Sequence, residues 1–206
     1  LFRSVVGSLS STGAALAAGI AGGTVANSST NAATFVSVGA GATVYSGTIG
    51  GSTSLLRSGA TAANTLTLLG ANTYTGATIV NGNGLILAGG GTLANTSSVT
   101  VNYASLTLDN NSGLAAVAAR LSSSAGISLS GGTLAFTGRQ FAADTQAVGA
   151  VTLAQGLSTI TSTPATAVSG GNSSADLTLA SLARAANSAT TVNFTANTGL
   201  GTIGSS

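Results

Sequence analysis

Short runs in which aliphatic residues alternate with Thr or Ser recur along the chain and predict a series of short β-strands. Most runs hold two Leu, Val or Ile residues separated by one hydroxyl residue, the pattern of a strand with one buried face. The predicted strands are Thr34–Val38, Ala42–Tyr45, Thr65–Leu69, Thr78–Asn81, Leu85–Leu87, Ser98–Asn102, Ser105–Leu108, Gly126–Leu129, Thr133–Phe136, Ala150–Leu153, Leu177–Leu179 and Thr191–Phe194. We therefore expect an all-β fold.

The same alternation predicts which side chains point into the core. Because successive side chains of a strand face opposite sides, the aliphatic residues of each run share one face. The expected inward pairs are Leu66 and Leu68, Leu85 and Leu87, Val99 and Val101, Leu106 and Leu108, Ile127 and Leu129, and Val151 and Leu153. The expected outward residues are Thr67, Thr100, Thr107, Ser128 and Thr152.

The strands come in pairs whose starts lie seven residues apart. The pairs begin at Thr78 and Leu85, at Val99 and Leu106, and at Ile127 and Leu134, and they recur after 21 and then 28 residues. A coil of roughly 20 residues with two or three strands returns the chain by one strand spacing, about 4.8 Å, along an axis. This spacing favours a parallel β-solenoid over an antiparallel sandwich, in which strands recur every 8–12 residues or so.

Glycine- and asparagine-rich turns separate the strands. They comprise Asn81–Gly84, Gly89–Gly91, Asn110–Asn111 and Gly131–Gly132, built from residues that tolerate left-handed backbone angles. In stacked coils, equivalent Asn side chains can bond to one another as ladders. The segment Ser162–Ser174 holds the single proline, Pro164, and is predicted to be a loop that bulges from the stack.

Two alanine-rich segments, Leu114–Leu121 and Leu179–Ala186, interrupt the β pattern. Their composition predicts one or two short helices, lying along the stack or over one of its ends. The whole chain, 1–206, is expected to form a single solenoid array. The absence of Met indicates a processed product or an excised piece of a longer protein.

Charge is scarce, which narrows the functional classes. Charged residues make up 4% of the 206 residues, against about 25% in an ordinary soluble domain. The arginines are widely separated, so the net charge of +2 does not form a nucleic-acid-binding surface. The apolar stretch Val5–Val25 is interrupted by Ser, Thr and Gly, and we expect no membrane span.

The residues that carry most enzyme and metal chemistry are missing. Without His, Cys, Lys or Glu, the chain cannot form a Ser-His-Asp triad, a Cys-His dyad or a histidine metal site. The remaining candidates are Asp109, Asp144 and Asp176, with Arg139 near Asp144. Paired carboxylates serve glycoside hydrolysis, but a surface ion pair is the simpler explanation for Arg139 and Asp144. We predict no enzymatic activity and no catalytic, cofactor-binding or metal-binding residue.

One stretch of the chain resembles a known family. Within residues 46–91, SGTIGGS at 46–52 is followed by TLTL at 65–68, GANTYTG at 70–76, TIVN at 78–81 and LIL at 85–87. This order of motifs is similar to the autotransporter-associated β-strand repeat of bacterial surface and secreted proteins. The resemblance implies a right-handed parallel β-helix, export across the cell envelope, and a role as an adhesin, surface layer or fibre.

Three functions fit these patterns. The first is a structural subunit that assembles with copies of itself into an extracellular filament or matrix, because uncharged solenoid ends leave unpaired strand edges. The alternative is an adhesin passenger domain on the bacterial surface that binds host or matrix glycans. The third is an ice-binding face, which requires regular rows of outward Thr such as Thr65 and Thr67.

Overall fold

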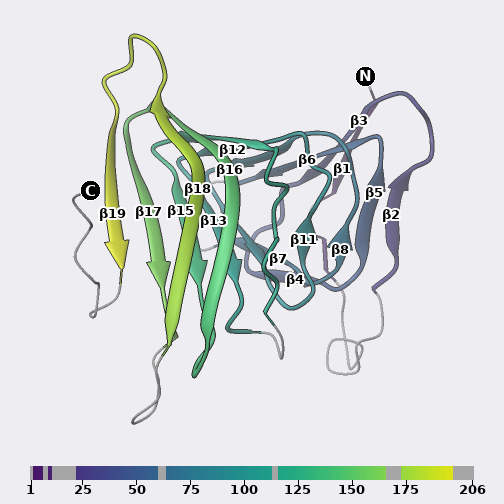
Figure 1. Ribbon diagram of the computed structural model, residues 1–206. Coiled ribbons are helices and arrows are strands. Elements are labelled where there is room, and N and C mark those ends of the chain that lie inside the picture. The colour runs from purple at the N-terminus through teal and green to yellow at the C-terminus, as the bar shows by residue number, and fades with distance from the viewer. Residues whose placement is uncertain are drawn as a thin grey trace.

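The computed structural model describes residues 2–6, 9–10, 22–59, 64–112, 116–165 and 173–196 (Figure 1). Every regular element within these ranges is a β-strand. The strands are β1 (Phe2–Val6), β2 (Thr24–Asn27), β3 (Ala33–Ser37), β4 (Thr43–Tyr45), β5 (Thr48–Gly51), β6 (Thr53–Ser58), β7 (Thr65–Leu68), β8 (Ala71–Asn72), β9 (Thr78–Asn81), β10 (Gly84–Leu87), β11 (Thr92–Leu93), β12 (Ser98–Asn102), β13 (Ser105–Asp109), β14 (Gly126–Ser130), β15 (Thr133–Thr137), β16 (Ala143–Gln155), β17 (Leu157–Thr163), β18 (Ser174–Arg184) and β19 (Thr191–Ala196).

Two large sheets contain most of these strands. The first sheet has eight strands in the order β1-β3-β6-β9-β12-β14-β16-β18, and the second has seven in the order β4-β7-β10-β13-β15-β17-β19. Two short pairs, β2-β5 and β8-β11, form a third side of the early coils. From β6 onward the chain passes from the first sheet to the second, and then returns to the first sheet beside its previous strand. Figure 1 shows the resulting stack, which runs from the purple N-terminal strands to the yellow β19.

All strand pairings within the sheets are parallel. This rules out the antiparallel sandwich for the described residues and is consistent with a β-solenoid. Parallel stacking also explains the interrupted sequence repeat, because extra residues are accommodated between strands without changing the pairing. The 28-residue step from Val99 to Ile127, for example, keeps these two residues in register between β12 and β14.

The register stacks like side chains into columns inside the coil. In the second sheet, Leu66, Leu85, Leu106, Leu134 and Ile160 are successive partners, and all five are buried. Burial of one such aliphatic side chain contributes about 1.5–3 kcal/mol. The columns therefore hold neighbouring coils together.

The predicted strands and inward residues are confirmed. Each of the twelve predicted strands overlaps a strand of the structure, and the predicted inward pairs are buried. The predicted outward residues, such as Thr67 and Thr107, are half-buried. The sequence pattern does not predict β1, β2, β5, β6, β8, β11 or β17. Four of these, β2, β5, β8 and β11, have only two to four residues, and β6 places Arg57 at an inward position.

The prediction of short helices is wrong. Leu179–Ala186 falls largely within β18, which pairs with β16 along most of its length. Residues 116–121 contain no helix, and 114–115 lie outside the described residues. Alanine prefers a helix in isolation, but pairing with β16 provides backbone hydrogen-bond partners that outweigh this weak preference.

The turns follow the prediction where they are described. Gly82, Gly89 and Gly131 adopt φ angles of +70°, +54° and +60°. An asparagine ladder of the expected kind forms where Asn102 Nδ2 donates to Asn81 Oδ1 at 2.8 Å. In the predicted Ser162–Ser174 loop, β17 extends to Thr163 and residues 166–172 lie outside the described part of the chain.

Much of Val5–Val25 also lies outside the described residues. No helix in the described ranges has the length and apolar character that crossing a membrane requires.

Candidate functional site

The stack ends at β18 and β19, which lie at the edges of the two large sheets. Within the described ranges, no further strand pairs with the outer side of either one. Their outer edges therefore present backbone N–H and C=O groups without a strand partner. Such an edge is a template for pairing with another chain.

Core-facing side chains are uncovered at this end. Phe194 pairs in register with Ile160 and so continues the buried column of the second sheet. Phe194 is 50% exposed, whereas Ile160 is 5% exposed. On β18, Leu177 and Leu179 pack against the core but remain only partly buried. The core is thus open where the next coil would lie.

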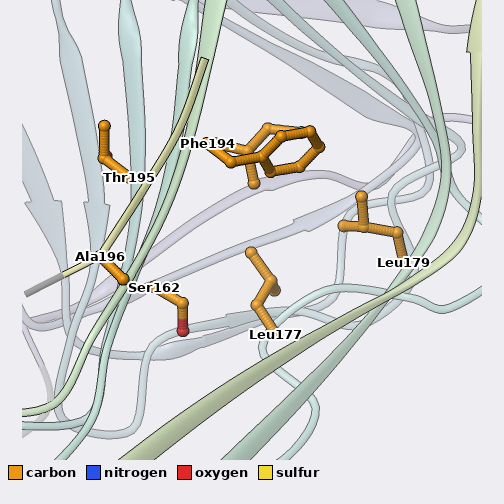
Figure 2. A pocket seen from close by; sticks show the side chains of 7 residues that line it. Ser162, Leu177, Leu179, Phe194, Thr195 and Ala196 are labelled. Carbon is orange, nitrogen blue, oxygen red and sulfur yellow. The ribbon is translucent and has the colours of Figure 1, made fainter. Parts of the chain in front are cut away.

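A cavity of about 260 Å³ lies between the two end strands. Figure 2 shows Leu177 and Leu179 of β18 and Phe194 of β19 pointing into this space. The remaining lining residues are Ile160, Ser162, Thr195 and Ala196. The lining is uncharged and mainly apolar, and therefore suits an apolar side chain better than a polar metabolite.

Few charges protect the open edges. Asp176 and Arg184 are the charged residues of β18, and β19 contains none. Edge strands of soluble proteins are commonly blocked by Lys, Pro or inward-pointing charges. This end lacks most of those protections.

The opposite end of the stack also has a hollow. β1 and β4 are the outer strands of the two large sheets there, and β2 is the outer strand of the β2-β5 pair. A cavity of about 390 Å³ is lined by Ser4, Val25, Ala26, Asn27, Ala33, Thr34, Phe35 and Thr53. Among the described residues, each end thus combines outer strands that lack a partner on one side with an uncharged hollow.

Arg120 is fully buried and joins three coils. Its Nη1 donates to the Gly91 carbonyl at 2.7 Å, its Nη2 to the Gly89 carbonyl at 3.1 Å, and its Nε to Asn110 Oδ1 at 2.9 Å. Its backbone N–H donates to Gln146 Oε1 at 3.3 Å. Burial lowers the pKa of Arg120, while the charges of Asp109 and Asp144 act in the opposite direction.

Arg57 fills a similar structural position near the N-terminal end. It is buried, and its guanidinium donates to Ser37 Oγ at 3.1 Å, the Gly39 carbonyl at 3.0 Å and the Asn64 carbonyl at 3.1 Å. Burial lowers the pKa of Arg57 as well. Both arginines bond chiefly to turn carbonyls, so they tie turns together instead of lining a cleft.

The prediction of a surface ion pair between Arg139 and Asp144 is partly wrong. The pair forms, with Arg139 Nη2 3.1 Å from Asp144 Oδ1, but the Asp144 side chain is completely buried. The Arg139 backbone N–H also donates to Asp144 Oδ2 at 2.7 Å. Burial alone would raise the pKa of Asp144, but hydrogen bonds and charge from Arg139, with a contribution from Asn110, lower it below its ordinary value.

The other two acidic candidates do not join Asp144 in a cleft. Asp109 Oδ1 accepts a hydrogen bond from the Asn111 backbone N–H at 2.8 Å, which closes a local turn. Asp176 lies on β18, paired with Thr145. Within the described ranges, no group of three His, Cys, Asp or Glu residues is placed to hold a metal ion. Asp144 thus has a structural environment, anchored to Arg139.

Sequence reasoning missed the buried arginines, although one signal was present. In β6, Thr53, Leu55 and Arg57 are alternate residues and all three are buried. The period of two therefore places Arg57 on the inward face. Arg120 has no comparable signal, because its segment is not a strand.

The outward rows of the second sheet do not form the regular Thr array expected of an ice-binding face. Thr67 is followed in register by Ile86, Thr107, Ala135 and Thr161. Aliphatic residues alternate with Thr in this row, which interrupts any repeating hydroxyl lattice.

Comparisons of the chain with protein-family models, with curated proteins and with solved structures find no match.

Proposed function

We propose that this protein is a non-enzymatic structural subunit that assembles end to end into a filament. In this proposal the fold is a right-handed parallel β-helix, the hand taken by nearly all parallel β crossover connections. The resemblance to the autotransporter-associated β-strand repeat supports a place on the bacterial cell surface or outside the cell. The partner is another copy of the same chain.

The uncovered column end at Phe194 carries the proposal. Phe194 has the same register position as four buried leucines and one buried isoleucine of earlier coils, yet half of its surface is exposed. A soluble protein gains by covering such a residue together with the adjacent cavity. A second copy can do this by adding its first coil to the last coil of its neighbour.

The sheet order indicates how two copies would join. β18 would pair with β1 of the next copy and extend the first sheet, so that the last coil of one copy lies on the first coil of the next. This joins two different surfaces, so the contact is heterologous and each added copy leaves the same end free. Repeated addition produces an open linear polymer.

The absence of enzymatic activity is part of the proposal. The only acidic residues are Asp109, Asp144 and Asp176, and Asp144 is occupied by Arg139 in a buried pair. A carboxylate held in this way stays ionised and inaccessible, which suits neither an acid nor a nucleophile.

Sedimentation and negative-stain electron microscopy of the 206-residue chain test the proposal. We expect ordered filaments to form above a threshold concentration. Phe194→Lys should raise that threshold at least about tenfold, because the charged side chain would have to be buried at each junction. The circular dichroism spectrum of Phe194→Lys should match that of the wild type, because position 194 is half exposed in the single subunit.

Thr107→Lys is the matched control. Thr107 lies on the outward face of a central strand, so a lysine there adds the same charge without touching either end. It should leave the threshold concentration unchanged. A wild-type chain that stays monomeric at millimolar concentration, or filaments that form equally well with Phe194→Lys, would contradict end-to-end assembly.

A further inference from the structure

Apart from the two hollows at the ends, a hollow lies along the side of the stack, where the chain turns from the first sheet into the second. Its volume is about 590 Å³, and we call it the turn groove. The lining residues are Ser58, Gly59, Asn81, Gly82, Asn102, Tyr103, Ser130 and Gln155. None of them carries a charge, and five coils contribute to the surface.

Backbone hydrogen bonds continue through these turns and make the groove rigid. The N–H groups of Gly59, Gly82, Tyr103 and Gly131 donate to carbonyls of the next coil, at Asn81, Asn102, Ser130 and Gln155, over 3.2, 3.0, 2.9 and 2.8 Å. Residues 59, 82, 103 and 131 therefore occupy equivalent positions. The groove is an ordered extension of the sheets and not a flexible loop.

Tyr103 is an unexpected residue at its position. The equivalent Gly82 and Gly131 have φ angles of +70° and +60°, and Tyr103 adopts +45°. A bulky side chain in this left-handed region is strained, whereas glycine is not. Tyr103 is also 64% exposed, so its ring contributes little to the core. Folding alone therefore does not explain why this turn has a tyrosine.

The tyrosine ring is held in place within the groove. It lies so close to Gly131 that a Cβ atom at position 131 would come within 2.8 Å of Tyr103 Cε1. Its hydroxyl accepts a hydrogen bond from Gln155 Nε2 at 2.8 Å, two coils away. Gly131 thus provides the space for the ring and Gln155 fixes its orientation, which leaves a pre-positioned aromatic surface facing solvent.

Amide groups lie beside this aromatic surface. Asn102 Nδ2 donates to Asn81 Oδ1 at 2.8 Å, which orients both side chains. In the described part of the chain, Asn81 Nδ2 and Asn102 Oδ1 have no hydrogen-bond partner, so a donor and an acceptor are available to a ligand. The Ser58 and Ser130 hydroxyls provide further hydrogen-bond donors and acceptors in the lining of the groove.

We propose that the turn groove binds an uncharged, extended glycan whose chain runs along the stack. A sugar ring has an apolar C–H face that packs on an aromatic ring, and adjacent hydroxyls that pair with an amide donor and acceptor. The lack of charge in the lining disfavours acidic polysaccharides and nucleic acids, which need cationic partners. This binding site is separate from both ends of the stack.

Cellohexaose is the probe for the test, with binding followed by ligand-observed NMR and by protection of tyrosine fluorescence from acrylamide. Tyr45 and Tyr74 are buried, so the quenchable signal reports Tyr103. Tyr103→Gly should weaken binding at least about tenfold, in line with the usual contribution of an aromatic stacking platform. Tyr103→Phe should keep most of the affinity, because the ring remains.

Two measurements separate binding from a structural role. Tyr103→Gly should leave the melting temperature unchanged or raise it, since glycine relieves the strained φ. Phe141→Gly is the matched control, because Phe141 is also an exposed aromatic residue with positive φ, at +55°, and does not line the groove. It should bind cellohexaose like the wild type. Phe194→Lys should also bind normally, because position 194 is at the stack end.

Three results would overturn the proposal. The wild type shows no cellohexaose binding at millimolar sugar, or Tyr103→Gly binds as well as wild type, or Phe141→Gly loses binding to the same degree. A fall in melting temperature for Tyr103→Gly, with unchanged binding, would assign the ring a purely structural role.

Discussion

The central coils and the C-terminal end have the same strand pattern but very different burial. Leu106 in β13 and Phe194 in β19 belong to one column of core residues. Leu106 is covered by coils on both sides, whereas within the described residues Phe194 has a coil on one side only. The alternating sequence pattern thus determines which face of a strand a residue occupies. Whether that residue is buried depends on a neighbouring coil that covers it.

Two core substitutions should show the largest difference in stability between the centre and the C-terminal end of the stack. Leu106→Ala is expected to lower the free energy of unfolding by about 3 kcal/mol, because the fully packed column cannot collapse around the cavity. Phe194→Ala should cost less than about 1 kcal/mol in the monomer, since much of the side chain is already in water. Urea unfolding followed by circular dichroism measures both. Equal losses would show that the end is as well packed as the centre.

A second pair of variants compares buried and exposed arginines. Arg120→Leu should lower the free energy of unfolding by about 2–3 kcal/mol, because the carbonyls of Gly89 and Gly91 and the Asn110 side chain lose a charged donor. Arg184→Leu removes the same charge from the exposed end strand and should change the free energy of unfolding by less than about 0.5 kcal/mol. The same denaturation curves test this, and a small Arg120 effect would contradict the role of its hydrogen bonds.

Acid should weaken the centre of the stack through Asp144. Its pKa lies below the ordinary value near 3.9. The folded state therefore binds fewer protons than the unfolded state in this range. The stabilisation is complete above about pH 4 and is lost as pH falls through the folded-state pKa. Asp144→Asn should reduce this acid sensitivity in melting temperatures measured between pH 2 and pH 6, values chosen to span roughly two units around the ordinary pKa. Unchanged acid sensitivity in Asp144→Asn would contradict this role for Asp144.

A small gain in stability is expected from a substitution at the turn between the two sheets. Tyr103→Gly should raise the free energy of unfolding by up to about 1 kcal/mol, because the strained backbone angle is relieved at the expense of a few surface contacts. Differential scanning calorimetry resolves a change of this size. A clear loss of stability would indicate that the ring on Gly131 contributes more than the backbone strain costs.

Features that depend on residues close together in the sequence could be predicted, and features that depend on distant residues could not. The Leu-Thr-Leu run of β7 was predictable because alternation and β-propensity act within a few residues. The LASLAR segment of β18 was not, because its local preference is helical and only the adjacent β16 makes it a strand. The burial of Arg120 likewise depends on the Gly89 and Gly91 carbonyls, which lie about 30 residues earlier in the chain.

The candidate sites show the same division. The scarcity of charged residues predicted unprotected strand edges from the sequence alone. That Phe194 is the exposed end of a core column follows only from its register with Ile160. No sequence pattern singled out Tyr103. Stacking placed it beside Gly131 and Gln155 from later coils and so created the turn groove.

By itself, the amino-acid sequence determined the β class, the inward face of most strands and the shortage of catalytic groups, because these depend on residue type and on spacing of two residues. The tertiary structure alone decided the buried arginine contacts, the uncovered end and the aromatic groove. Each of these arises from side chains 20 to 50 or so residues apart that meet only when one coil lies on the next.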